Sequence, residues 1–125
     1  MKIYLAGGMK SGWQKKVKRA CRAFDVIFFD PCSHGLSDPA QYTLWDLDRI
    51  HQCDILFGFM ETTNPSGHGL SAEIGYAHGL GKKIILVDEK SDRYMAIVRE
   101  IADVVLSSLQ DGIVFLKSVT RKELC

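Results

Sequence analysis

Residues 55–60 (ILFGFM) and 64–77 (NPSGHGLSAEIGYA) follow one another along the chain and decide its fold. The first run is apolar throughout and predicts a buried strand. The second run begins with turn residues and glycines and continues as a helix from about residue 70, with Glu73 in its first turn. A strand, a glycine-rich loop and a helix N-terminus form a common ligand-binding corner of α/β proteins. We therefore expect a small-ligand site here, with Glu73 facing it.

The rest of the chain repeats this alternation of apolar runs and helical patterns. We predict strands at residues 2–6, 26–29, 54–60, 84–87 and 103–106. We predict helices at residues 12–24, 42–52, 70–80, 92–100 and 108–117. Ser11 should cap the first helix and Gly81 should end the third. The two prolines and the glycine of residues 30–41 predict a loop there.

Strands that are apolar throughout and separated by helices indicate a parallel sheet covered on both faces. Right-handed crossovers then give an α/β three-layer sandwich with a five-stranded parallel sheet, in the flavodoxin-like order 2-1-3-4-5. We expect a single domain over residues 1–125. In the helix at residues 42–52, Leu44, Leu47 and Ile50 share one face and are expected to be buried.

The composition is that of an ordinary globular protein, with 46% hydrophobic residues, 25% charged residues and a net charge of +1. This balance argues against electrostatic binding to nucleic acid or to a membrane surface. The spacing of the cysteines and histidines predicts no metal site, and Cys21 and Cys53 are expected to be buried reduced thiols. The absence of a signal segment and of a long apolar run predicts a cytoplasmic protein. We expect no cofactor.

The strand order brings the loops after the first and third strands to one crevice. The first loop contains Gly7, Gly8 and Met9, and the second covers residues 62–69. Neither loop matches the G-x-G-x-x-G fingerprint or the P-loop pattern. The hydroxyls and glycine amides of the second loop, together with the helix dipole, would still suit an anion or a sugar hydroxyl.

The acidic residues near this crevice allow two interpretations. Glu73 is either a helix-start carboxylate, stabilised by ~0.3–1 kcal/mol through the macrodipole, or a nucleophile or base. Asp46 lies on the helix that begins near the same crevice, and two carboxylates at one cleft suit glycosidic chemistry. Tyr4, in the first strand, either orients a carboxylate or packs against a helix. His68 is either a ligand contact or a solvent-exposed side chain.

At these residues the chain resembles the nucleoside 2-deoxyribosyltransferase family. The resemblance is carried by residues 3–7 (IYLAG), by residues 46–56 (DLDRIHQCDIL) and, most specifically, by residues 69–77 (GLSAEIGYA). The last segment fits the family pattern G-x-x-x-E-x-G-x-A. These segments occur in the expected order over the first two-thirds of the chain.

The resemblance implies that Glu73 is the nucleophile that attacks C1′ of the deoxyribose and forms a covalent intermediate. It implies that Tyr4 positions Glu73, and that Asp46 binds the base and helps to move its proton. The expected ligand is a small nucleoside or nucleotide, bound by Gly7, Gly8, Met9, Ser66, Gly67, His68, Gly69 and Met95. The family also implies a homodimer or a higher homo-oligomer with shared active sites.

Gly67 departs from the family pattern, because transferases often carry an aspartate six residues before the nucleophile. Transfer of the deoxyribosyl group between bases is the leading hypothesis. The alternative is hydrolysis of deoxynucleoside 5′-monophosphates, in which related N-glycosidases hold the phosphate with a serine- and glycine-rich loop. A non-catalytic nucleotide-binding module and a TIR-like NAD-cleaving enzyme are further alternatives on comparable folds.

Overall fold

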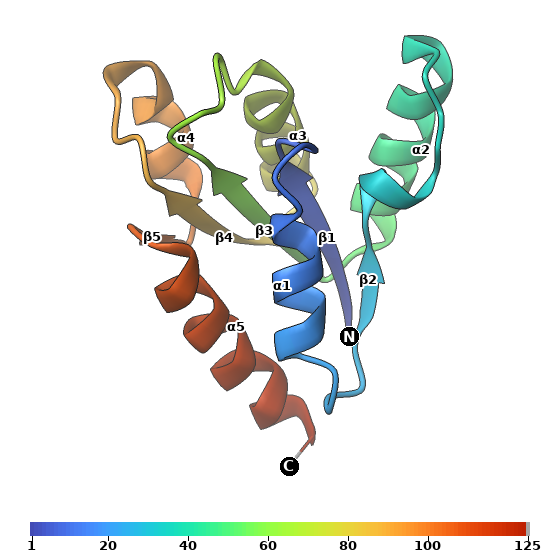
Figure 1. Ribbon diagram of the computed structural model, residues 1–125, viewed down its shortest axis with the longest axis vertical. Helices are drawn as coiled ribbons and strands as arrows, with labels where there is room; N and C mark the ends of the chain where they lie inside the picture. The colour runs from blue at the N-terminus through green and yellow to red at the C-terminus, as the bar shows by residue number, and fades with distance from the viewer. Residues whose placement is uncertain (125) are drawn as a thin grey trace.

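The computed structural model describes residues 1–124, and the side chains of residues 1–120. Within this range the centre of the molecule is a parallel five-stranded sheet in the order β2-β1-β3-β4-β5 (Figure 1). The strands are β1 (Lys2–Gly7), β2 (Ile27–Phe29), β3 (Ile55–Met60), β4 (Lys83–Asp88) and β5 (Val104–Leu106). The predicted α/β class and the predicted strand order are therefore confirmed.

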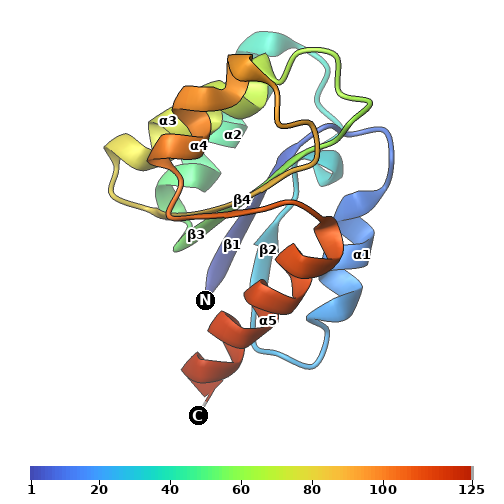
Figure 2. The ribbon, with the colours of Figure 1, turned by 90° about the vertical axis from the view of Figure 1, so that its left-hand side faces the viewer.

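Helices cover both faces of this sheet. Helices α1 (Trp13–Ala20) and α5 (Leu109–Leu124) lie on one face. Helices α2 (Pro39–Gln52), α3 (His68–Gly79) and α4 (Ala96–Ile101) lie on the other face. Two short 3₁₀ helices, η1 (Pro31–Ser33) and η2 (Arg93–Met95), precede α2 and α4. Figure 2 shows the sheet between these two helical layers.

The strand side chains alternate between two apolar cores because successive residues of a strand point to opposite faces. In β1, Ile3 and Leu5 pack toward α1 and α5, whereas Tyr4 and Ala6 pack toward α2 and α3. All four of these side chains are buried. Tyr4 thus carries a hydroxyl group into the core beneath the second helical layer.

Helices α2 and α3 both begin earlier than the sequence pattern predicts. Helix α2 begins at Pro39, inside the predicted loop, because Asp38 caps it by accepting the Ala40 N–H at 3.3 Å and proline suits the first helical position. Helix α3 begins at His68, because Gly67 adopts a left-handed conformation with φ of 71° and serves as its N-cap. Glu73 consequently lies in the second turn of α3, and its prediction in the first turn was wrong.

Three further local predictions were wrong. Ser11 does not cap α1, whose N-cap is the left-handed Gly12. Leu44 is 71% exposed, because the N-terminal half of α2 extends past the end of β2 (Figure 1). Ile27 is 54% exposed, because β2 is an edge strand and is not covered on both faces. Gly81 does end α3 as predicted, with φ of 74° and its N–H donated to the His78 carbonyl.

Candidate active site

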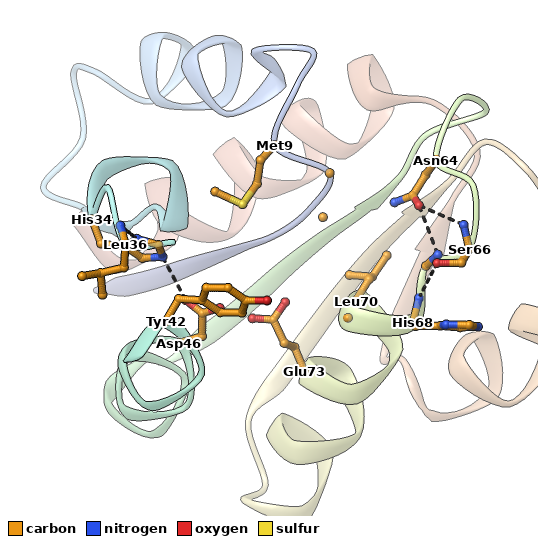
Figure 3. A pocket seen from close by; sticks show the side chains of 14 residues that line it. Met9, His34, Leu36, Tyr42, Asp46, Asn64, Ser66, His68, Leu70 and Glu73 are labelled. Carbon is orange, nitrogen blue, oxygen red and sulfur yellow. Dashed lines mark hydrogen bonds and ion pairs between the residues drawn. The ribbon is translucent and has the colours of Figure 1, made fainter. Parts of the chain in front are cut away.

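A cavity of about 380 Å³ lies at the carboxyl ends of β1 and β3, where the strand order reverses. The loops after these two strands, the segment between η1 and α2, and helices α2 and α3 form its wall (Figure 3). Most of the residues predicted to bind substrate line this cavity, namely Gly7, Gly8, Met9, Ser66, Gly67, His68 and Gly69. The two glycine-rich loops therefore meet at one site.

Two carboxyl groups also line the cavity, Asp46 from α2 and Glu73 from α3. The Tyr4 hydroxyl donates a hydrogen bond to Oε2 of Glu73 from the buried side of the site. The three residues predicted to be catalytic, which come from one strand and two helices, are thus brought together. The bond also fixes the direction in which the Glu73 carboxylate faces the cavity.

Burial shifts the proton affinity of both carboxyl groups. It raises the pKa of Glu73 to about 7, although the hydrogen bond from Tyr4 lowers that pKa and the nearby charge of Asp46 raises it further. Burial also raises the pKa of Asp46, against the lowering effects of His34 and Tyr4. Burial, followed by the charge of Glu73, raises the pKa of Tyr4 far above its ordinary value, so Tyr4 remains a hydrogen-bond donor. Two carboxyl groups in unlike environments can divide the roles of nucleophile and acid.

Four residues line the cavity that the sequence analysis did not place there, namely His34, Leu36, Tyr42 and Leu70, and Asn64 joins them from within the predicted second loop. Asn64 orders the second glycine loop, since its Oδ1 accepts the N–H groups of Ser66 and Gly67 at 3.2 and 3.1 Å. This turn is a known property of asparagine and was readable from the sequence. His34 follows the short 3₁₀ helix η1, in a segment whose sequence has no hydrophobic periodicity. The sequence therefore did not predict that it lies beside Asp46.

Met95 does not line this cavity. It is 1% exposed, and its sulfur lies 3.4 Å from Oγ of Ser71. It forms part of the floor under Gly67 and lines a neighbouring cavity of about 530 Å³ that shares Ser66 and His68 with the first. Its predicted contact with substrate is therefore not supported by its position in this single chain.

Among the described side chains, no group of three or more His, Cys, Asp or Glu residues is placed to hold a metal ion. None of the helices within residues 1–124 combines the length and apolar character needed to cross a bilayer. Cys21, Cys32 and Cys53 are free thiols, and the first and last of these are buried as predicted. Cys125 lies outside the described residues.

The fold and the cavity together define a doubly wound α/β protein with a small-ligand site at its switch point, where two carboxyl groups and a tyrosine meet. The sequence pattern of the nucleoside 2-deoxyribosyltransferase family matches residues 3–114, and the chain belongs to this family. Membership supports an enzyme of the nucleoside 2-deoxyribosyltransferase kind that takes small nucleoside substrates. No curated protein sequence matches the chain.

Solved structures with a similar fold include two 2-deoxyribosyltransferases and one N-glycosidase. A 2-deoxyribosyltransferase from Bacillus psychrosaccharolyticus has a TM-score of 0.72 at 22% identity, covering 89% of each chain. A CMP N-glycosidase from Clostridium botulinum has a TM-score of 0.67 at 23% identity, covering 95% of this chain and 99% of that one. A 2-deoxyribosyltransferase from Leishmania mexicana has a TM-score of 0.69 at 17% identity, covering 91% and 95%. At these identities the similarity establishes the fold alone.

Proposed function

We propose that the protein cleaves the N-glycosidic bond of 2′-deoxynucleosides and transfers the deoxyribosyl group to a second base. The observation that carries this proposal is the hydrogen bond from Tyr4 to Glu73 at a cavity that Asp46 also lines. This arrangement supplies an oriented nucleophile and a second carboxyl group within one small-ligand site. The membership of the chain in the nucleoside 2-deoxyribosyltransferase family supports the same chemistry.

In the first half-reaction, the ionised Glu73 carboxylate attacks C1′ and forms a C1′–O bond. The C1′–N bond breaks, and its electron pair leaves with the base. Asp46 donates a proton to the departing base and becomes a carboxylate. The carboxylate of Glu73 also stabilises the positive charge that develops on the sugar before the covalent bond is complete.

In the second half-reaction, a nitrogen of another base attacks C1′ and releases Glu73, while Asp46 recovers a proton from that base. Because the pKa of Glu73 is raised to about 7, the nucleophile becomes ionised only as the pH rises through that value. We therefore expect kcat/KM to increase as the pH rises through about 7.

The test is to incubate the protein with a deoxynucleoside and a different free base and to follow base exchange. Intact mass measurement with a deoxynucleoside alone should detect one deoxyribosyl group on Glu73. Glu73→Gln should lower kcat/KM by at least ~1,000-fold, because the covalent intermediate no longer forms. Glu100→Gln, at an exposed position on α4, is the matched control and should retain activity. A protein that binds nucleotides but never releases a base would be a binding module instead.

The position of Gly67 favours a second candidate function, hydrolysis of deoxynucleoside 5′-monophosphates. A Cβ at this position would lie 3.0 Å from both Sδ and Cε of Met60, and the left-handed backbone disfavours a side chain there. The loop therefore carries no aspartate to repel a phosphate, while the start of α3 and the hydroxyl of Ser66 are available to it. Release of deoxyribose 5-phosphate from a monophosphate, without base exchange, would favour the hydrolase over the transferase.

A further inference from the structure

The side chain of His34 is 6% exposed and has a different hydrogen-bond partner on each side of its ring. Its Nδ1 accepts the N–H of Leu36 at 2.8 Å. A neutral imidazole that accepts at Nδ1 carries its proton on Nε2, so the backbone of Leu36 assigns the tautomer. The Nε2 atom lies 3.6 Å from Oδ1 of Asp46 (Figure 3). His34 therefore presents a donor to Asp46.

The orientation of the His34 ring is fixed by aromatic contacts with α2. Trp45 meets the ring edge to face, with centroids 4.9 Å apart and planes at 70°. The guanidinium of Arg49 lies over the Trp45 ring, 4.9 Å from its centroid, and further restrains that ring. Because Trp45, Asp46 and Arg49 all belong to α2, the helix sets the relation between the imidazole and the carboxyl group.

Oδ1 of Asp46 is buried and has no hydrogen-bond partner within the described part of the chain. Tyr4 lies close enough to lower the pKa of Asp46, but its single hydroxyl proton is donated to Glu73 and makes no hydrogen bond to Oδ1 of Asp46. The remaining group that faces this oxygen with a proton is Nε2–H of His34. A distance of 3.6 Å is long for a hydrogen bond, and such contacts at active sites commonly shorten when substrate binds.

We propose that His34 is a positioning residue for the N-glycosidic cleavage described above, and that its Nε2–H stabilises the carboxylate charge that develops on Asp46. This inference rests on the proposed function. As the C1′–N bond breaks, its electron pair goes to the base, and the proton of Asp46 moves to a nitrogen of that base. Asp46 is left with a negative charge, and His34 keeps its own proton throughout. A fixed donor aimed at the atom that gains charge lowers the barrier to this proton transfer.

The titratable and charged groups around Asp46 determine how a substitution of His34 changes the acidity of Asp46. Tyr4 faces Asp46 from β1 and Glu73 faces it from α3, while His34 approaches from the loop after η1. Arg49, stacked over Trp45, carries the nearby positive charge of α2. Removing His34 removes an interaction that favours the ionised form of Asp46, so Asp46 should become a weaker acid.

Two variants test separately the acceptor function of Nδ1 and the donor function of Nε2 in His34. His34→Asn can keep an acceptor for the Leu36 N–H but lacks a donor that reaches Asp46. His34→Gln can place its amide nitrogen near the position of Nε2 but loses the acceptor at the position of Nδ1. Each variant is assayed with a deoxynucleoside, whose base needs a proton to leave, and with 4-nitrophenyl 2-deoxyriboside, whose phenolate leaves without one.

We expect His34→Asn to lower kcat/KM for the deoxynucleoside by about 10- to 100-fold, with little change for the nitrophenyl substrate. His34→Gln should retain most of the activity with both substrates. Wild-type activity in His34→Asn, or equal losses with both substrates in both variants, would overturn this role alone. A wild-type protein that releases no base would overturn the proposed function together with it.

Discussion

The α1/α5 face and the α2/α3/α4 face of the sheet share the same strands but differ in what they bury. On the first face, Trp13 packs against Phe57 and Phe59, with ring centroids 6.1 and 5.3 Å apart, and the core is apolar apart from the buried side chains of Gln14 in α1 and Thr120 in α5. On the second face, the core includes Tyr4, whose hydroxyl is bound to Glu73 at the edge of a cavity. Because side chains alternate between the two faces along β1, the packed core and the reactive site lie on opposite faces of the same strand.

The loss of folding free energy caused by the buried carboxyl groups is confined to one face of the sheet. An apolar core gains stability from burial. A carboxyl group that is buried beside a second carboxyl group loses stability when it is ionised. Substitutions on the first face should therefore change unfolding without changing catalysis, whereas substitutions at the site should change catalysis and can even stabilise the fold.

The largest effect on stability is expected for Glu73→Gln and depends on pH. The pKa of Glu73 is raised from 4.5 to about 7 in the folded state, so between these values the folded protein holds the proton more tightly than the unfolded chain. The wild-type protein consequently loses stability as the pH rises through this window, by about 3 kcal/mol in full. The variant lacks this loss and should be more stable than wild type at pH 8, but not at pH 4.

Urea unfolding at both pH values measures this difference. Glu100→Gln, at an exposed position, is the control and should show no comparable pH-dependent gain. A Glu73→Gln protein that is less stable than wild type at pH 8 would show that the ionised carboxylate contributes to the fold, and the two faces would then not differ as described.

Tyr4→Phe is expected to have the next largest effect, because it removes the donor to Glu73 while keeping the buried ring. A hydrogen bond to a charged group is worth about 2 kcal/mol, which corresponds to roughly 30-fold in kcat/KM at neutral pH. The same bond lowers the pKa of Glu73, so the acid limb of the pH profile should move to higher pH. Tyr76→Phe, on the surface of α3, is the control; an unchanged acid limb in Tyr4→Phe would contradict the assigned role.

The difference between the two faces also explains what the sequence could predict. The strands and their order follow from continuous apolar runs and the handedness of crossovers, and both were predicted correctly. Tyr4, Asp46 and Glu73 were identified by residue type and motif. The start of α3 was predicted too late, because Gly67 becomes its N-cap in a left-handed conformation that depends on tertiary packing against Met60 of β3 and Met95 of η2. The pairing of His34 with Asp46 depends on how α2 packs beside an irregular loop, which no local pattern encodes.

Gly112→Ala tests the packed face. A Cβ at this position in α5 would lie 2.3 Å from Cγ2 of Val87 and 3.1 Å from Cζ of Phe57, so α5 would have to move away from the sheet. Overpacking of this kind costs about 1–3 kcal/mol, partly offset by the better helix propensity of alanine. We expect a net loss of about 1–2 kcal/mol in the free energy of unfolding and an unchanged kcat/KM. A large change in kcat/KM at temperatures where the variant is folded would mean that the two faces are coupled.

Gly75→Ala is the counterpart on α3, and its expected effect is the smallest. Nothing lies within 4 Å of a Cβ built at this position, which is exposed and only two residues from Glu73. Replacing glycine by alanine inside a helix stabilises by up to about 1 kcal/mol, because alanine loses less backbone entropy on folding. Thermal unfolding should show this small gain with no change in kcat/KM, since Gly75 does not line the cavity. Lower activity with intact folding would instead show that the outer surface of α3 contributes to the site, and the boundary between packed core and reactive site would then lie farther out than the single chain indicates.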